Sequence, residues 1–165
     1  MTTLAHALRD GALVAAAAST VVMGSLRANP RLFMRHFPTA LRERLAPLSA
    51  AEMRAGRVVG ALLLLLLVGG PMASTLATAA RDATLGFPTL FAHGFVVGMV
   101  FNAVDWLILD ELWLGVLKPA WALPPGATID DFQPFDHGRH ARGFAAGAIL
   151  AAGVAAISAA VASVL

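Results

Sequence analysis

Four long runs without a charged residue constrain the fold of this chain more than any other feature of its sequence. They cover residues 11–26, 58–80, 83–104 and 143–165. A helix needs about 20 apolar residues to cross a bilayer, because each residue rises ~1.5 Å against a hydrocarbon thickness of ~30 Å. The last three runs reach that length, so the sequence predicts helices that span a membrane.

The composition agrees with contact between the protein and a lipid bilayer. Hydrophobic residues make up 58% of the chain and charged residues 13%, whereas soluble domains carry about 25% charged residues. The absence of cysteine excludes disulfides, zinc-thiolate sites and iron–sulfur clusters. No basic tail or basic–aromatic pattern indicates nucleic acid as a partner. We therefore expect an all-α integral membrane protein.

We expect one four-helix transmembrane domain over residues 1–165. The expected spans are residues 8–27, 57–80, 87–109 and 142–164, joined by two long loops at 28–56 and 110–141. The first run is short and rich in alanine, and it reaches spanning length only if it begins at Leu8 or earlier. The alternative is a buried or interfacial first helix, which would move the N-terminus to the other side.

Basic residues mark one side of the predicted membrane domain. Of the 12 arginines and lysines, only Arg9 and Arg81 lie outside the two long loops and their edges. Such a bias places the basic loops in the cytoplasm. Trp106, Trp113 and Trp121 cluster on the same side, as expected for an interfacial belt. The sequence thus predicts a multi-pass cell-membrane protein with cytoplasmic long loops and both termini outside.

The first long loop has the signals of short helices. Asn29 followed by Pro30 is typical of a helix start, and Ser49 with Glu52 forms a capping-box pattern that should open the second long helix. The loop between them is partly amphipathic, with leucines and phenylalanines beside arginines. It would lie along the inner leaflet or pack over its own bundle.

Two further signals concern the second and third spans. Pro71 cannot donate a backbone hydrogen bond, which predicts a kink in the second span. The third span should begin at Phe87-Pro88 and can continue as helix to Leu117, because Lys118-Pro119 stops it.

The fourth span has two contrasting faces. Its bulky residues share one arc at about 100° per residue, and its alanines lie roughly opposite. The bulky set is Leu150, Val154, Ile157, Val161 and Val164. Small faces allow close helix approach in lipid, and the GxxxG pairs Gly94/Gly98 and Gly143/Gly147 favour it too. We expect the alanine face to contact protein and the bulky face to contact lipid or a partner, which suits self-association or other membrane helices as partners.

Asp105 is the most informative polar residue, because acids at membrane depth are rare and tend to face a bundle interior or water. Asn102 lies three residues earlier on the same predicted face. Together with Asp110 they are the candidate catalytic or transport residues. The alternatives are an Asp105 that pairs with a loop arginine, and a solvated Asp110 at the helix end.

His137 and His140 stand at i, i+3 at the start of the fourth span and could present two nitrogens to one metal, with Asp136 as a further candidate ligand. The alternative is that Asp136 caps the helix and the rest anchor it at the interface. His93, within the third span, should hydrogen-bond across helices or bind a haem iron. No cofactor is otherwise specified.

Three functional hypotheses follow from the sequence. The first is a helix-packing subunit or homo-oligomer without chemistry of its own. The second is a small proton- or ion-linked transporter that uses Asp105. The third is a membrane enzyme with a metal or lipid-headgroup site at the cytoplasmic interface. The enzyme hypothesis requires that Asp105 lines a cleft, and the transporter hypothesis requires that it faces a polar passage. The packing hypothesis requires neither.

Overall fold

The computed structural model describes residues 3–133 and 136–164, and within these ranges the chain is helical with no strand. Four helices are long and apolar enough to cross a membrane. They are α1 (Thr3–Ala28), a rod formed by α3 (Ala50–Leu64), η2 (Leu65–Gly69) and α4 (Gly70–Arg81), a second rod formed by α5 (Phe87–Val104) and η3 (Asp105–Leu117), and α6 (His137–Ala162). The all-helical prediction is confirmed, and the short first run is part of a 26-residue helix.

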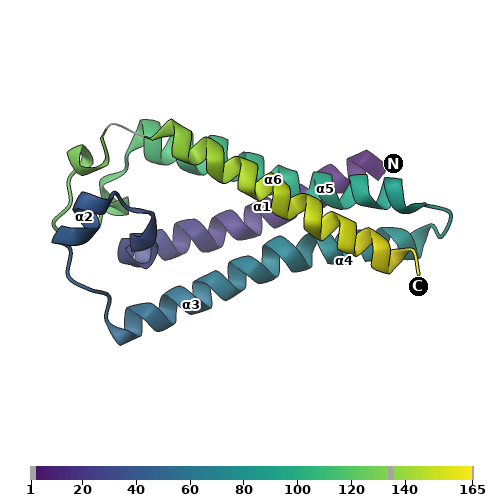
Figure 1. Ribbon diagram of the computed structural model, residues 1–165, viewed down its shortest axis with the longest axis horizontal. Helices are drawn as coiled ribbons and strands as arrows, with labels where there is room; N and C mark the ends of the chain where they lie inside the picture. Colours follow the sequence, from purple (N-terminus) through teal and green to yellow (C-terminus); the bar gives the residue numbers. More distant parts are fainter. Residues whose placement is uncertain (1–2, 134–135, 165) are drawn as a thin grey trace.

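The four rods run lengthwise, so that the molecule has two distinct ends (Figure 1). At the loop end lie α2 (Thr39–Arg44) and the segments that join α1 to α3 and η3 to α6. At the terminal end lie the start of α1, the end of α6 and the short turn between α4 and α5. Helix α5 packs against α1, α4 and α6. All 15 residues of α3 remain at least partly exposed.

The first loop consists of short helical segments, and side chains cap the helix starts in and after it, as predicted. The Asn29 side chain accepts from the backbone amide of Arg31 at 3.0 Å and starts η1 (Pro30–His36), with Pro30 in its first turn. Ser49 and Glu52 form the reciprocal capping box at the start of α3. These contacts satisfy backbone N–H groups that a helix start leaves without partners.

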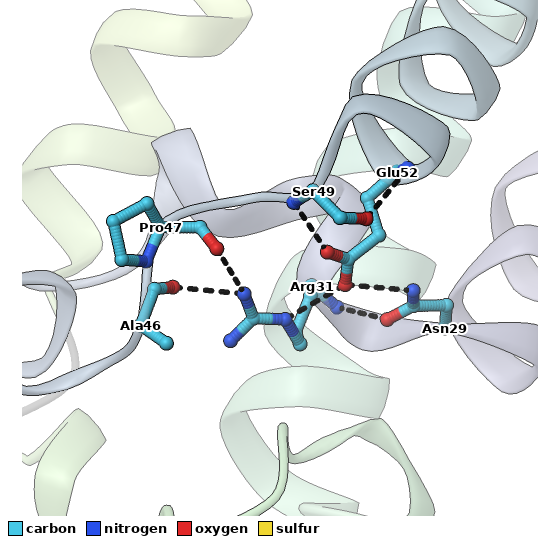
Figure 2. A network of polar contacts seen from close by, with 6 residues as sticks. All are labelled: Asn29, Arg31, Ala46, Pro47, Ser49 and Glu52. Carbon is cyan, nitrogen blue, oxygen red and sulfur yellow. Dashed lines mark hydrogen bonds and ion pairs between the residues drawn. The ribbon is translucent and has the colours of Figure 1, made fainter.

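A polar network ties this loop to α3 (Figure 2). Arg31 Nε donates to Glu52 Oε1 at 2.8 Å, and its terminal nitrogen donates to the carbonyls of Ala46 and Pro47 at 2.8 and 3.1 Å. The Asn29 amide also donates to Glu52, at 3.2 Å. One guanidinium therefore fixes both ends of the 30–49 segment, because its planar donors reach several acceptors at once.

The rod from α3 to α4 and the rod from α5 to η3 each contain a π-helical segment. The turn η2 ends at Gly69, two residues before Pro71. The expected disturbance in the second long helix therefore takes the form of a π-helical turn, a recognised cause of helix bending. In the other rod, η3 continues to Leu117. It ends at Lys118, which has a left-handed backbone (φ 46°) and donates its N–H to Trp113 O at 2.9 Å. The predicted stop at Lys118-Pro119 is confirmed.

Small residues set the packing between α5, α4 and α6. A Cβ added at Gly94 would lie 2.7 Å from Thr75 Oγ1, and one at Gly98 would lie 2.9 Å from Ala151 Cβ. The alanine face of α6 turns inward as expected, with Ala155 fully buried. The prediction for the bulky face is wrong at Val154, which is 7% exposed and shares the inner face with Ala151 and Ala155 because they lie three residues before and one after it.

Candidate functional site

A cavity of about 490 Å³ lies at the loop end of the bundle. Its walls come from the C-terminal part of α1, the α3–η2 junction, η3 and the first turns of α6, and both long loops contribute to it. Six aromatic side chains line it: Phe33, Phe37, Phe101, Trp113, Trp121 and Phe132. Aliphatic residues such as Leu63, Leu67 and Leu109 complete its apolar walls. A cavity of this size suits a small organic molecule.

Two aspartates of η3 face this cavity together with one histidine of α6. Asp110 Oδ2 is 2.5 Å from His140 Nδ1, which forms an ion pair when the imidazole is protonated. Asp105 lies just over one turn deeper in the bundle and also lines the cavity. Within residues 3–133 and 136–164 no hydrogen bond or ion pair to the Asp105 carboxylate is present. Asp105 is thus an acid in an apolar wall without a bonded partner.

Basic groups lie on the loop side of the same cavity. Arg35, Lys118 and Arg139 contribute to its lining, and Arg35 Nε donates to His36 Nε2 at 2.9 Å. Desolvation in the wall, followed by the charge of Arg35, lowers the pKa of His36, although part of its ring stays accessible. A neutral imidazole is what an acceptor for the arginine requires.

The two loops meet over the cavity and close this end of the molecule. The second loop contains two short helices, η4 (Ala120–Ala122) and η5 (Ile129–Phe132). Phe132 meets Phe37 edge to face at a centroid distance of 5.5 Å, and Asp131 forms an ion pair with Arg44. Apolar rings therefore hold the loops together beneath an exposed ion pair. We call residues 30–44 and 120–132 the lid.

The structure brings some of the predicted site residues together and separates others. Asp105, Asp110, Asp136 and His140 all line the cavity. Asn102 does not: its amide donates to the Phe144 carbonyl at 2.9 Å and holds α5 against α6. Asn102 and Asp105 are three residues apart, so their side chains point about 60° apart around the helix. Asn102 therefore packs against α6 while Asp105 lines the cavity.

The histidines proposed as metal ligands have carboxylate partners on η3. His137 Nδ1 lies 2.8 Å from Glu111 Oε2, whereas His140 reaches Asp110. The Asp136 side chain accepts from the Arg139 amide at 2.8 Å, which confirms that it caps α6. Across the described part of the chain, no group of three or more histidines and carboxylates has a metal-binding arrangement.

A second polar cluster, which the sequence reasoning missed, lies at the terminal end. The Ser74 hydroxyl donates to Asp10 Oδ2 at 2.7 Å and lies 2.8 Å from His93 Nε2. Thr78 Oγ1 is 3.3 Å from the same nitrogen, and Arg9 pairs with Asp10 at 2.7 Å. The hydroxyl proton of Ser74 is used on Asp10, so Nε2 of His93 must be the donor. We call Asp10, Ser74, Thr78 and His93 the terminal network.

The terminal network joins three long helices, because its members come from α1, α4 and α5. His93 is 2% exposed and Thr78 5%. The expected hydrogen bond of His93 across helices is confirmed. Ser74 and Thr78 are four residues apart on α4, and this spacing, which presents two hydroxyls on one helix face, is the sequence signal that could have indicated the cluster.

Comparison with known protein families, with curated proteins and with solved structures finds no match to this chain.

Proposed function

We propose that this protein is a small membrane carrier that takes up an amphipathic organic molecule in the loop-end cavity, with Asp105 as its polar contact. The observation that carries the proposal is an apolar cavity of about 490 Å³ lined by the Asp105 carboxylate, which bonds none of the described residues. Buried acids are costly in an apolar wall. Such an acid is expected where a ligand or a proton supplies the partner for the carboxylate that the protein does not.

The contrast between the two ends supports carriage rather than permanent storage. Glycine contacts and the terminal network pack the terminal end closely, and the pocket beside His93 is about 110 Å³ there, whereas the loop end holds the cavity of about 490 Å³ beneath the lid. A bundle closed on one side and hollow on the other resembles one state of an alternating-access cycle. Among the described residues, the two segments of the lid meet in one ring pair and one ion pair. They can therefore separate from each other while the Arg31 network keeps the first segment attached to α3.

We test the proposal by filling the cavity. Leu67 lines the cavity, whereas Leu65, two residues away on η2, is 67% exposed and does not line it. Protein purified in mild detergent is extracted with organic solvent, and the bound small molecules are identified by mass spectrometry. Wild type and Leu65→Trp should retain the same amphiphile, and Leu67→Trp should lose it. Equal retention by both variants would contradict the proposal.

For orientation we propose that the loop end faces the cytoplasm and both termini face outward. Ten of the 12 basic residues support this, because they lie in or beside the two long loops. The chain has no cysteine, so a single introduced thiol reports its own side. Ala83→Cys, at the terminal end, should react with an impermeant maleimide in intact cells, and Ala40→Cys in the lid should react only after lysis. The reverse pattern would overturn the orientation.

A second candidate function is a helix-packing subunit or homo-oligomer. It is favoured by α6, where a Cβ added at Gly143 or Gly153 would meet nothing within 4 Å. These positions leave room for a second helix to approach closely. Mass measurement in detergent, on wild type and on Gly153→Leu, tests this role. A dimer that the leucine weakens supports it, and a monomer in both cases excludes it.

A further inference from the structure

We infer that the loop-end cavity takes a lipophilic organic cation, such as a hydrophobic amine or a quaternary ammonium compound. This inference rests on the proposed function of the cavity and specifies the charge and shape of its ligand. Three features of the site carry it: the local balance of charge around Asp105, the aromatic side chains in the walls, and the place of the basic groups.

The charge near Asp105 is negative. The charged groups close enough to act on its carboxylate are Asp110 and His140. Asp110 already holds His140 at 2.5 Å, so the imidazole can balance at most one of the two carboxylates. Among the described residues no basic side chain forms an ion pair with Asp105. Its carboxylate therefore remains to be offset by a proton or by a bound cation, because an unpaired carboxylate is unfavourable in an apolar wall.

The walls determine which kind of cation fits. Divalent metal ions require several oxygen ligands, whereas leucines and aromatic residues make up much of the lining of the cavity that Asp105 shares. Phe101 precedes Asp105 by one helical turn, and Trp113 and Trp121, with ring centroids 5.8 Å apart, line the same cavity. Aromatic faces attract organic cations, and more strongly where water is excluded. A cation with an apolar body therefore satisfies both the acid and the walls.

The basic residues of the cavity do not neutralise this site. Arg35, Lys118 and Arg139 line its loop side, and none of them forms an ion pair with Asp105 among the described residues. The charge of Arg139 acts instead on Asp110 and on His36. An anion would meet these groups near the lid, but it would lie against the uncompensated Asp105 if it went deeper. The cavity thus favours a cation at its inner end.

Two hydrophobic ions of the same shape and opposite charge separate the possibilities. Tetraphenylphosphonium and tetraphenylborate are each titrated into full-length protein in detergent, with the fluorescence of Trp113 and Trp121 as the signal. Wild type should bind the cation, and Asp105→Asn should bind it about tenfold or more weakly. Asp105→Glu keeps the charge and should restore binding. Asp82→Asn, in the exposed turn at the terminal end, should bind like wild type.

The outcomes separate the inference from the function on which it rests. If only the anion binds, or if Asp105→Asn binds the cation as tightly as wild type, the inference is overturned while a binding cavity remains. If neither ion binds and Leu67→Trp retains the same small molecules as wild type, the proposed function fails as well. A melting temperature for each variant identifies any loss of binding that comes from misfolding.

Discussion

The terminal end and the loop end of the bundle both contain polar groups that are at least partly buried, but the bonding of these groups differs. At the terminal end, Asp10, Ser74 and His93 bond one another across three helices at 2.7 and 2.8 Å. At the loop end, Asp105 faces an apolar cavity and makes no such bond within the described residues. Polar groups that satisfy each other rigidify a bundle. An unsatisfied polar group beside a cavity indicates that its partner comes from outside the protein.

The packing of side chains also differs between the terminal end and the loop end. Near the terminal network, Gly94 lets Thr75 and the Ala155 backbone approach α5 closely. The loop end instead has large side chains around empty space, closed by segments that lie outside the bundle. Stability and binding are therefore expected to depend on opposite ends of the molecule. Each substitution below tests this division at one end, from the largest expected effect to the smallest.

Overpacking the terminal end should destabilise the bundle most. In Gly94→Val the new Cβ would lie 2.7 Å from Thr75 Oγ1 and 3.4 Å from the Ala155 backbone, so a helix must shift. We expect the free energy of unfolding in mixed micelles to fall by about 3 kcal/mol. Gly60→Val in α3 is the matched control, because nothing lies within 4 Å of a Cβ there. Equal losses for the two variants would show that helix propensity, not packing, is responsible.

Removing the imidazole should have the next largest effect. His93→Phe keeps a ring of similar size but leaves the hydroxyls of Ser74 and Thr78 without their shared partner. We expect a loss of about 1–2 kcal/mol in the same unfolding measurement. Thr20→Ala is the control, because Thr20 bonds the Ala16 carbonyl of its own helix in an exposed position. A loss in His93→Phe no greater than in the control would mean that the terminal network is not structural.

Local rules were sufficient to predict much of the fold from the sequence. The capping box of Ser49 and Glu52, the Asp136 cap and the stop at Lys118 each depend on residues within a few positions of one another. Helix starts and stops are encoded at that range. Run length and hydropathy indicated the four long helices in the same way, since both are properties of continuous segments.

The arrangement of the sites could not be predicted in this way. Ser74 lies 64 residues from Asp10 and 19 from His93, so the terminal network exists only once three helices have packed. The lid depends on Arg44 and Asp131, 87 residues apart. Asn102 bonds the Phe144 carbonyl, 42 residues away, rather than facing the cavity with Asp105. Sequence reasoning found Asp105, but not the cavity that gives it a role.

Replacing the acid at the loop end should reverse the sign of the effect on stability. Asp105→Leu removes a carboxylate without a bonded partner from an apolar wall, and we expect the free energy of unfolding to stay level or to rise by about 1 kcal/mol. The same variant should lose its bound amphiphile. Asp10→Leu, the corresponding change in the terminal network, should destabilise instead. If Asp105→Leu were the more harmful of the two, Asp105 would be a structural residue.

The smallest effect is expected in the lid, where the carboxyl group of Asp131 titrates. The backbone amide of Thr128 donates to Asp131 at 2.8 Å, and with the Arg44 guanidinium it lowers the pKa of that carboxyl. A lowered pKa means that the ionised form stabilises the lid above the unfolded value of about 4. This contribution disappears as the pH falls through the lower folded value. Because the pair is exposed, its loss should loosen the lid without unfolding the bundle.

Hydrogen exchange of residues 128–133, measured between about pH 5 and pH 2 and corrected for intrinsic rates, reports this change in the lid. Protection should fall toward the acid limit in wild type, and in Asp131→Asn it should be low and independent of pH. Asp130→Asn alters the neighbouring exposed acid and should titrate like wild type. If exchange in α5 rose together with exchange in the lid, the two ends would not be independent. The division between a rigid terminal end and an adaptable loop end would then be wrong.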